Sequence, residues 1–76
     1  MADPAALLAE IERRYAAQAL RIDRTDGLSL EFAEWRFNLR SSNTEPVVRL
    51  NVETRGDPAM LIRRRDELLA VVHAFA

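Results

Sequence analysis

Residues 28–53 read LSLEFAEWRFNLRSSNTEPVVRLNVE, and apolar side chains take every second position in three parts of this stretch. A period of two is typical of a β-strand that has one covered face and one open face. The pattern therefore predicts three strands. Their apolar positions are Leu28, Leu30 and Phe32 in the first, Trp35, Phe37 and Leu39 in the second, and Val48, Leu50 and Val52 in the third.

A further strand is predicted before this stretch, because Leu20 and Ile22 alternate with charged residues. Residues 25–27 read Thr-Asp-Gly, and Asp-Gly between two alternating segments is a strong signal for a tight hairpin. Residues 33–34, Ala-Glu, predict a short second turn. Successive strands joined in this way favour an antiparallel sheet.

Two helices are predicted on either side of the strands, at residues 4–17 and 58–75. Each follows an Asp-Pro pair, at residues 3–4 and 57–58, in which the carboxylate can cap the first turn and proline suits the first helical position. Position 65 falls on the apolar stripe of the second helix, so the stem of Arg65 is expected to lie over the core with its charge in water. The apolar stripes are Leu7, Leu8, Ile11 and Tyr15 in the first helix, and Leu61, Ile62, Leu68, Leu69, Val72 and Phe75 in the second.

The predicted order of elements is α-β-β-β-β-α, and the predicted fold class is α+β. In this two-layer sandwich, two helices cover one face of a four-stranded antiparallel sheet. The 76 residues are expected to form a single domain. The opposite face of the sheet is left open and polar. The residues expected on it are Arg21, Asp23, Ser29, Glu31, Arg36, Asn38, Arg40, Arg49, Asn51 and Glu53.

The composition argues against several kinds of function. The chain has 11 basic and 12 acidic residues, so its net charge of −1 selects neither nucleic acid nor an anionic membrane as a partner. It has no cysteine, which excludes disulfides and thiolate chemistry. No apolar run approaches the ~20 residues that span a bilayer. We therefore expect a cytoplasmic protein without a nucleic-acid or membrane partner.

The segment between the last two strands holds the candidate site, and it reads RSSNTEP over residues 40–46. The guanidinium of Arg40 offers a planar fork of donors for phosphate oxygens. Hydroxyl, amide and backbone N–H groups can complete a small anion site. The same residues also suit a plain polar turn. On chemistry alone, both interpretations stay open.

Residues 40–53, RSSNTEPVVRLNVE, resemble the C-terminal signature of the α-D-phosphohexomutases. Residues 25–29 and 35–39 are also similar to the phosphomannomutase members of that family. The resemblance covers about residues 15–57, which corresponds to the last of the family's four domains. It implies a TATA-binding-protein-like fold.

By that resemblance, Arg40, Ser42, Asn43 and Thr44 contact the non-reacting phosphate of the substrate, and Ser41 lies where the family tolerates alanine. The family interconverts 6-phospho and 1-phospho sugars, with a phosphoserine and Mg²⁺ held by its other domains. The implied function is substrate-phosphate binding in a phosphomannomutase that interconverts mannose 6-phosphate and mannose 1-phosphate, with mannose or glucose phosphates as the substrate class. The chain is expected to be an excised fragment without catalytic or metal-binding residues. It would be inactive alone, and its partners would be the other domains of the parent enzyme.

The alternative function is a non-enzymatic RNA- or protein-binding α+β module. RNA-binding sheets stack bases on aromatic residues of their open face. Here the alternation places Trp35 and Phe37 on the covered face instead, which favours a role in the core. A docking role for the open face remains compatible with the pattern.

The remaining reactive residues are interpreted as structural. His73 lies near the end of the second helix, where solvation or a contact with the helix dipole is expected. One histidine without cysteine cannot form a zinc site. A weak Mg²⁺ site at Glu31 and Glu34 is outweighed by the ordinary occurrence of such charges beside hairpins. The expected ion pairs are Glu45 with Arg49 or Arg36, and Arg63 with Glu67.

Overall fold

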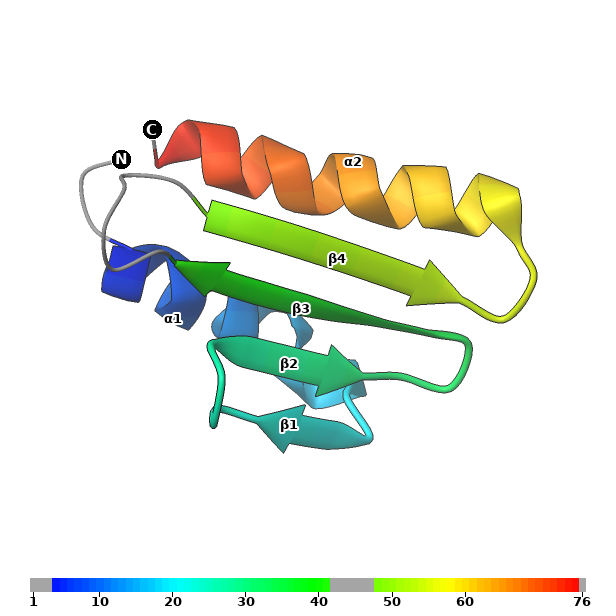
Figure 1. Cartoon of the computed structure of the whole chain (residues 1–76), viewed down its shortest axis with the longest axis horizontal. Coiled ribbons are helices and arrows are strands. Elements are labelled where there is room, and N and C mark those ends of the chain that lie inside the picture. Colours follow the sequence, from blue (N-terminus) through cyan, green and yellow to red (C-terminus); the bar gives the residue numbers. More distant parts are fainter. Residues whose placement is uncertain (1–3, 42–47, 76) are drawn as a thin grey trace.

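The computed structural model describes residues 4–41 and 48–75. Its elements follow the predicted order (Figure 1). They are α1 (Pro4–Tyr15), a 3-10 turn (Ala16–Gln18), β1 (Arg21–Asp23), β2 (Leu28–Glu31), β3 (Trp35–Ser41), β4 (Val48–Thr54) and α2 (Pro58–Ala74). The strands pair in the order β1-β2-β3-β4, each antiparallel to its neighbour. The predicted α+β fold is confirmed.

The core lies between the sheet and both helices. Leu7 and Ile11 of α1 and Leu68 of α2 are completely buried there, together with Leu39 of β3. Burying a leucine or isoleucine side chain contributes about 1.5–3 kcal/mol, so these contacts hold the two layers together. The aromatic part of the core includes Tyr15, Phe32, Trp35 and Phe37, with Phe32 and Trp35 stacked at 4.3 Å between ring centroids. The prediction that Trp35 and Phe37 belong to the core is confirmed.

The two predicted hairpin turns differ in width. At residues 33–34 the turn is tight, because the Phe32 N–H donates to the Trp35 carbonyl at 2.8 Å. The connection around residues 25–27 is wider than a two-residue hairpin, since the last residue pair of β1 and β2 joins Asp23 to Ser29. The side chain of Asp23 accepts a hydrogen bond from the Thr25 N–H at 2.8 Å and so stabilises this wider loop.

One apolar position of the predicted first strand is not covered. Leu20 is 73% exposed, whereas the alternation with Ile22 placed it inside. It lies one residue before β1, at the outer edge of the sheet, and its N–H donates to the Glu31 carbonyl at 2.7 Å. Because α1 packs chiefly against β2, the helical layer does not extend over this corner.

The inward face of α2 also differs from the prediction. Ile62 is 49% exposed, and the side chain of Arg65 is half exposed. Arg64 lies inward in its place, with the guanidinium carbon 4.8 Å from the Trp35 ring centroid. The buried residues of α2 are Leu68, Val71 and Val72, and Arg64 lies one turn before them on the same face.

Polar contacts at the start and in the middle of α2 stabilise this helix. The predicted cap is confirmed, because the Asp57 carboxylate accepts from the Met60 N–H at 3.0 Å. Glu67 pairs with Arg64 at 3.2 Å, where the sequence predicted Arg63. The corresponding capping prediction for Asp3 lies outside the described residues. None of the helices in the described part of the chain is long and apolar enough to cross a membrane.

Candidate anion-binding site

The candidate site lies where β3 and β4 approach each other on the open face of the sheet. Arg40 is the next-to-last residue of β3, and its side chain is exposed on this face. The other three predicted contacts, Ser42, Asn43 and Thr44, lie outside the described residues, as does Glu45. The structure therefore places Arg40 alone among the four, and the assignment of all four to a phosphate stays a prediction.

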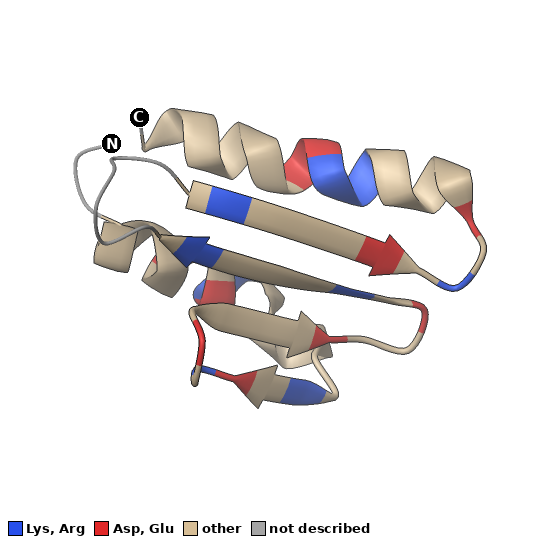
Figure 2. Cartoon of the chain, in the orientation of Figure 1, with Lys and Arg blue, Asp and Glu red and all other residues tan. Residues whose placement is uncertain are grey.

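Arg49 of β4 lies directly opposite Arg40 in the strand register. The next pair, Ser41 with Val48, is the last of the ladder, so the segment 42–47 joins two adjacent strand ends. Residues opposite each other on one sheet face have their Cβ atoms about 4.5–5.5 Å apart, and like charges in this arrangement repel. The two basic positions lie beside each other at this end of the sheet (Figure 2). An anion between the two guanidinium groups would relieve the repulsion.

The sequence analysis did not include Arg49 in the site. Arg49 was predicted on the open face and as an ion-pair partner for Glu45, but not as a phosphate contact. The signal that identifies it is the register of β3 and β4, because the pairing of Arg40 with Arg49 follows once Ser41 pairs with Val48. The alternation alone leaves the register open by steps of two residues, because such a shift keeps every side chain on its own face of the sheet.

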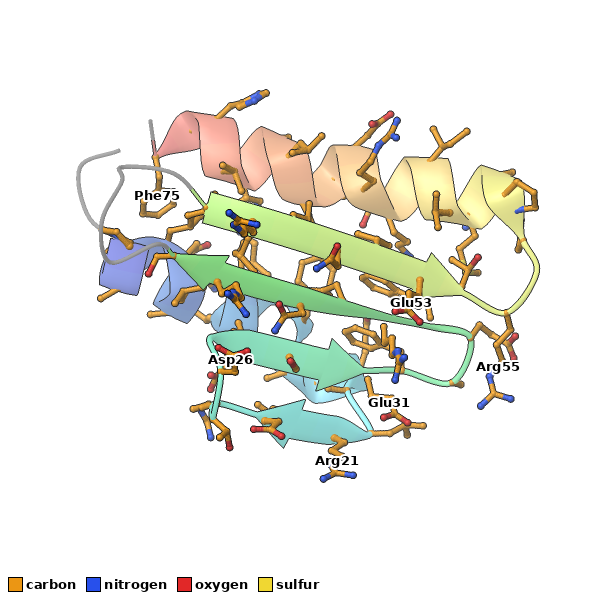
Figure 3. All side chains as sticks on the ribbon, viewed as in Figure 1. Arg21, Asp26, Glu31, Glu53, Arg55 and Phe75 are labelled. Carbon is orange, nitrogen blue, oxygen red and sulfur yellow. The ribbon has the colours of Figure 1, made fainter. Side chains whose placement is uncertain are left out.

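The guanidinium of Arg40 has an acidic partner outside its own hairpin. Its Nη1 donates to Oδ2 of Asp26 at 2.9 Å. Asp26 belongs to the connection between β1 and β2, which reaches back toward the end of β3 (Figure 3). The side chains of Arg40 and Asp26 are 47% and 76% exposed, so the pair adds little to stability.

The loop that carries Asp26 fits closely against β3. Gly27 has φ of +76°, and a Cβ atom there would lie 2.6 Å from both the Arg40 Cβ and the Leu39 carbonyl oxygen. In addition, the Asn38 Nδ2 donates to the Asp26 carbonyl at 3.1 Å and to the Ser29 Oγ at 2.8 Å. The backbone beside Arg40 is thus fixed by a close glycine contact and by a side-chain amide.

The opposite end of the open face carries balanced charges. The strand register joins Arg21 to Glu31, Glu31 to Arg36 and Arg36 to Glu53, which gives a row of alternating sign across the four strands. Arg36 pairs with Glu53 at 2.9 Å. The predicted pairing of Glu45 with Arg49 or Arg36 lies outside the described residues. Together with Asn38 and Asn51, the row lines a shallow hollow of about 500 Å³.

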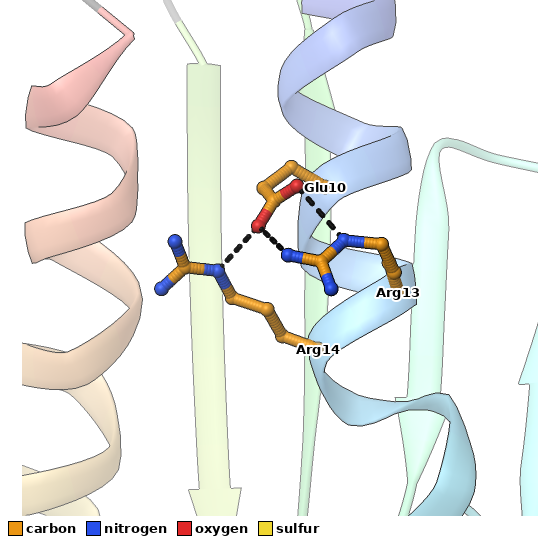
Figure 4. A network of polar contacts seen from close by, with 3 residues as sticks. All are labelled: Glu10, Arg13 and Arg14. Atoms are coloured by element: carbon orange, nitrogen blue, oxygen red, sulfur yellow. Dashed lines mark hydrogen bonds and ion pairs between the residues drawn. The ribbon is translucent and has the colours of Figure 1, made fainter.

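The two carboxylates of α1 form hydrogen bonds with arginine side chains. Glu10 accepts from Arg13 Nε at 3.1 Å, from Arg13 Nη2 at 2.5 Å and from Arg14 Nε at 2.6 Å (Figure 4). These hydrogen bonds lower the pKa of the Glu10 carboxyl to about 2. The pKa of the Glu12 carboxyl is lowered in the same way by Arg24. Within residues 4–41 and 48–75, no group of three or more His, Cys, Asp or Glu side chains is placed to hold a metal ion.

Comparison with known proteins finds a family that matches most of this chain. The family model described as "Phosphoglucomutase/phosphomannomutase, C-terminal domain" matches residues 1–71. A "Phosphomannomutase" of Salmonella typhimurium strain LT2 is 59% identical over 73 residues, which are 96% of this chain and 16% of the relative.

Two further relatives agree with this match. A "Phosphomannomutase" of Escherichia coli strain K12 is 51% identical over 73 residues, again 96% of this chain and 16% of the relative. One named "Phosphohexose mutases" from Xanthomonas campestris pv. campestris is 54% identical over 66 residues, 87% of this chain and 15% of the relative. The chain therefore spans about one sixth of the length of these relatives.

Proposed function

Because the chain belongs to the family of phosphoglucomutase/phosphomannomutase C-terminal domains, we propose that it binds the phosphate group of a sugar phosphate at the end of β3 and β4. The whole enzyme would be a phosphomannomutase that interconverts mannose 6-phosphate and mannose 1-phosphate. In the proposed site, Arg40 and Arg49 supply guanidinium groups. Ser42, Asn43 and Thr44 would supply hydroxyl and amide donors from the segment between them.

The observation that carries this proposal is the pairing of Arg40 with Arg49 on the open face. A phosphate dianion suits this arrangement, since each guanidinium presents a rigid fork of N–H donors to phosphate oxygens. The balanced row of Arg21, Glu31, Arg36 and Glu53 offers no comparable excess of positive charge. A phosphate is therefore expected at one end of the face, beside the segment 42–47.

The proposed role in catalysis is positioning. A phosphate that does not react can supply binding energy that orients the reacting end of the sugar, provided that its binding geometry is fixed. The groups that transfer the phosphoryl group would lie in the enzyme's other domains, which are the proposed partners of this chain. By itself the chain is not expected to catalyse the reaction.

The Mg²⁺ implied by the family resemblance does not fit the described residues of this chain. Mg²⁺ needs oxygen ligands in near-octahedral geometry, usually including one or two carboxylates. Glu10 and Glu12 of α1 each accept hydrogen bonds from arginines, and side chains two residues apart on a helix point to different faces. The Mg²⁺ would be bound by other domains of the enzyme.

Chemical-shift mapping tests the proposed function. Titration of mannose 6-phosphate into the ¹⁵N-labelled chain is expected to shift the signals of residues 40–45 and of Arg49 first, and inorganic phosphate should shift the same signals. Mannose without phosphate is the matched control and should leave them unchanged. Shifts centred on residues 63–65, or equal shifts with mannose, would contradict the proposal. Tight and salt-sensitive binding of single-stranded RNA instead would favour the alternative module.

A further inference from the structure

We infer that Asp26 is a positioning residue for Arg40, whose side-chain oxygen holds the guanidinium in the orientation that receives the phosphate. The inference rests on the proposed function and deepens it, because it assigns a role to a residue outside the β3–β4 segment. Asp26 would act through Arg40, without contact between its own carboxylate and the ligand.

The first observation is the geometry of the ion pair. Arg40 Nη1 donates to Asp26 Oδ2 at 2.9 Å. Among residues 4–41 and 48–75, Asp26 is the one side chain that hydrogen-bonds to this guanidinium. No described side chain hydrogen-bonds to Nε or Nη2 of the same group, so these two atoms are the donors that the proposal assigns to an anion. An arginine has several rotatable bonds, and fixing such a side chain before the ligand arrives reduces the entropy lost on binding.

The second observation is that Asp26 itself is held in place. Gly27 approaches Arg40 so closely that any side chain there would collide with the Arg40 Cβ. Asn38 also binds the Asp26 carbonyl from the strand that carries Arg40. The carboxylate is thus presented from a fixed backbone, although the side chain is largely exposed. A freely moving acid on a loop tip could not orient its partner in this way.

The third observation concerns charge. Arg49 faces Arg40 across the strands, so the two guanidinium groups repel each other in the absence of an anion. A bond from Asp26 keeps Arg40 on the open face against this repulsion. However, the negative charge of Asp26 also opposes an incoming phosphate. A useful experiment must therefore separate the oxygen acceptor from the charge.

Two variants at one position make this separation. Asp26→Asn and Asp26→Ala both remove the charge, but the asparagine amide keeps an oxygen that can accept from Arg40 Nη1. Inorganic phosphate is the probe, titrated into the full 76-residue chain. D26A is expected to bind phosphate about three- to tenfold more weakly than D26N, which is the range for releasing one immobilised arginine. ¹⁵N relaxation of the Arg40 Nε–Hε group should show greater mobility in D26A than in D26N without ligand.

Glu53 provides the matched control. It lies on the same open face and pairs with Arg36 in place of Arg40. E53A and E53Q are expected to bind phosphate equally well. Equal phosphate affinities for D26A and D26N would overturn the inference, even if both variants bind. Absence of any phosphate response in the wild-type chain would overturn the proposed function, and the inference with it, so the two failures are distinguishable. Unchanged amide signals of the buried residues would show that the variants keep the fold.

Discussion

The two faces of strand β3 show how one segment can serve both stability and binding. Trp35, Phe37 and Leu39 point into the core, and each is at most 6% exposed. The intervening Arg36 and Arg40 lie on the open face and make ion pairs there. Because the backbone is shared, the packing of the first set fixes the position of the second. The rigid core thus holds Arg40 in register with Arg49.

The arginines on the open face of β3 differ in the charge of the residue that lies opposite each of them. Arg36 lies opposite Glu53, whereas Arg40, four residues later on the same strand, lies opposite Arg49. Arg36 is therefore paired with an acid on the neighbouring strand, whereas the acid that pairs with Arg40, Asp26, lies in the connection between β1 and β2. The cross-strand partner, more than the residue type, determines which end of the face can attract an anion.

The largest expected effect comes from the covered face. Leu39→Ala should lower the free energy of unfolding by about 2–5 kcal/mol, since it leaves a cavity beneath the sheet. Arg36→Ala, on the other face of the same strand, should change it by at most about 0.5 kcal/mol. Urea denaturation followed by Trp35 fluorescence measures both variants. Equal losses would show that the two faces of β3 do not divide their roles as described.

The second effect sharpens the comparison on the open face. Arg49→Ala should weaken phosphate binding by about tenfold or more, which is typical for the loss of hydrogen bonds between charged groups. The same variant should leave thermal stability unchanged or slightly raised, because it removes the repulsion of Arg40. Isothermal titration calorimetry and a thermal melt provide the two readings. A loss of affinity accompanied by an equal loss of stability would point to a structural role for Arg49.

Two glycines provide the third test, which concerns the loop beside Arg40. Gly27 and Gly56 both have positive φ, at 76° and 73°, so alanine costs about 1–2 kcal/mol at either position. Only Gly27 also lies against β3, while no atom lies within 4 Å of a Cβ at Gly56. We expect G27A to be the more destabilised variant in urea and to weaken phosphate binding. If G56A proves equally harmful, the close contact of the loop with Arg40 is unimportant.

The smallest expected effect is a pH dependence on the helical side of the molecule. Hydrogen bonds from Arg13 and Arg14 lower the pKa of the Glu10 carboxyl from 4.5 to about 2. A lowered folded-state pKa gives stability that is fully present above pH 4.5 and is lost as the pH falls toward 2. Glu10→Gln should reduce the fall of the urea midpoint over this interval. Parallel pH profiles for wild type and variant would contradict the contribution of this group.

Most of the fold followed from local patterns in the sequence. The strands were predicted because buried and exposed positions alternate, and α2 begins where Asp57 and Pro58 predicted. The predictions of buried and exposed positions failed where a segment has no apolar residue, or where no helix covers the sheet. Residues 63–66 contain no apolar side chain, so the sequence could not determine that Arg64, and not Arg65, faces the Trp35 ring. Leu20 fits the alternation, but no helix extends over its corner of the sheet.

The candidate site was predictable in part, for a related reason. Arg40 stood out because it precedes a segment rich in hydroxyl and amide groups. Asp26 and Arg49 join it only through pairing of residues that are distant in sequence. The sequence predicted a tight turn at residues 25–27, whereas Asp26 pairs with Arg40 from the wider loop that the structure shows. Such contacts depend on the strand register, which the alternation of apolar residues leaves open by steps of two residues.

The central claim is that the end of the sheet formed by Arg40 and Arg49 binds phosphate. Its most direct test is the affinity of inorganic phosphate for three forms of the chain: wild type, Arg40→Ala and Arg36→Ala. Both substitutions remove one exposed arginine from the same face of β3, so they change the net charge equally. We predict that Arg40→Ala abolishes measurable binding and that Arg36→Ala retains nearly all of it. Equal weakening by the two variants would contradict the claim, because binding would then depend on overall charge and not on this site.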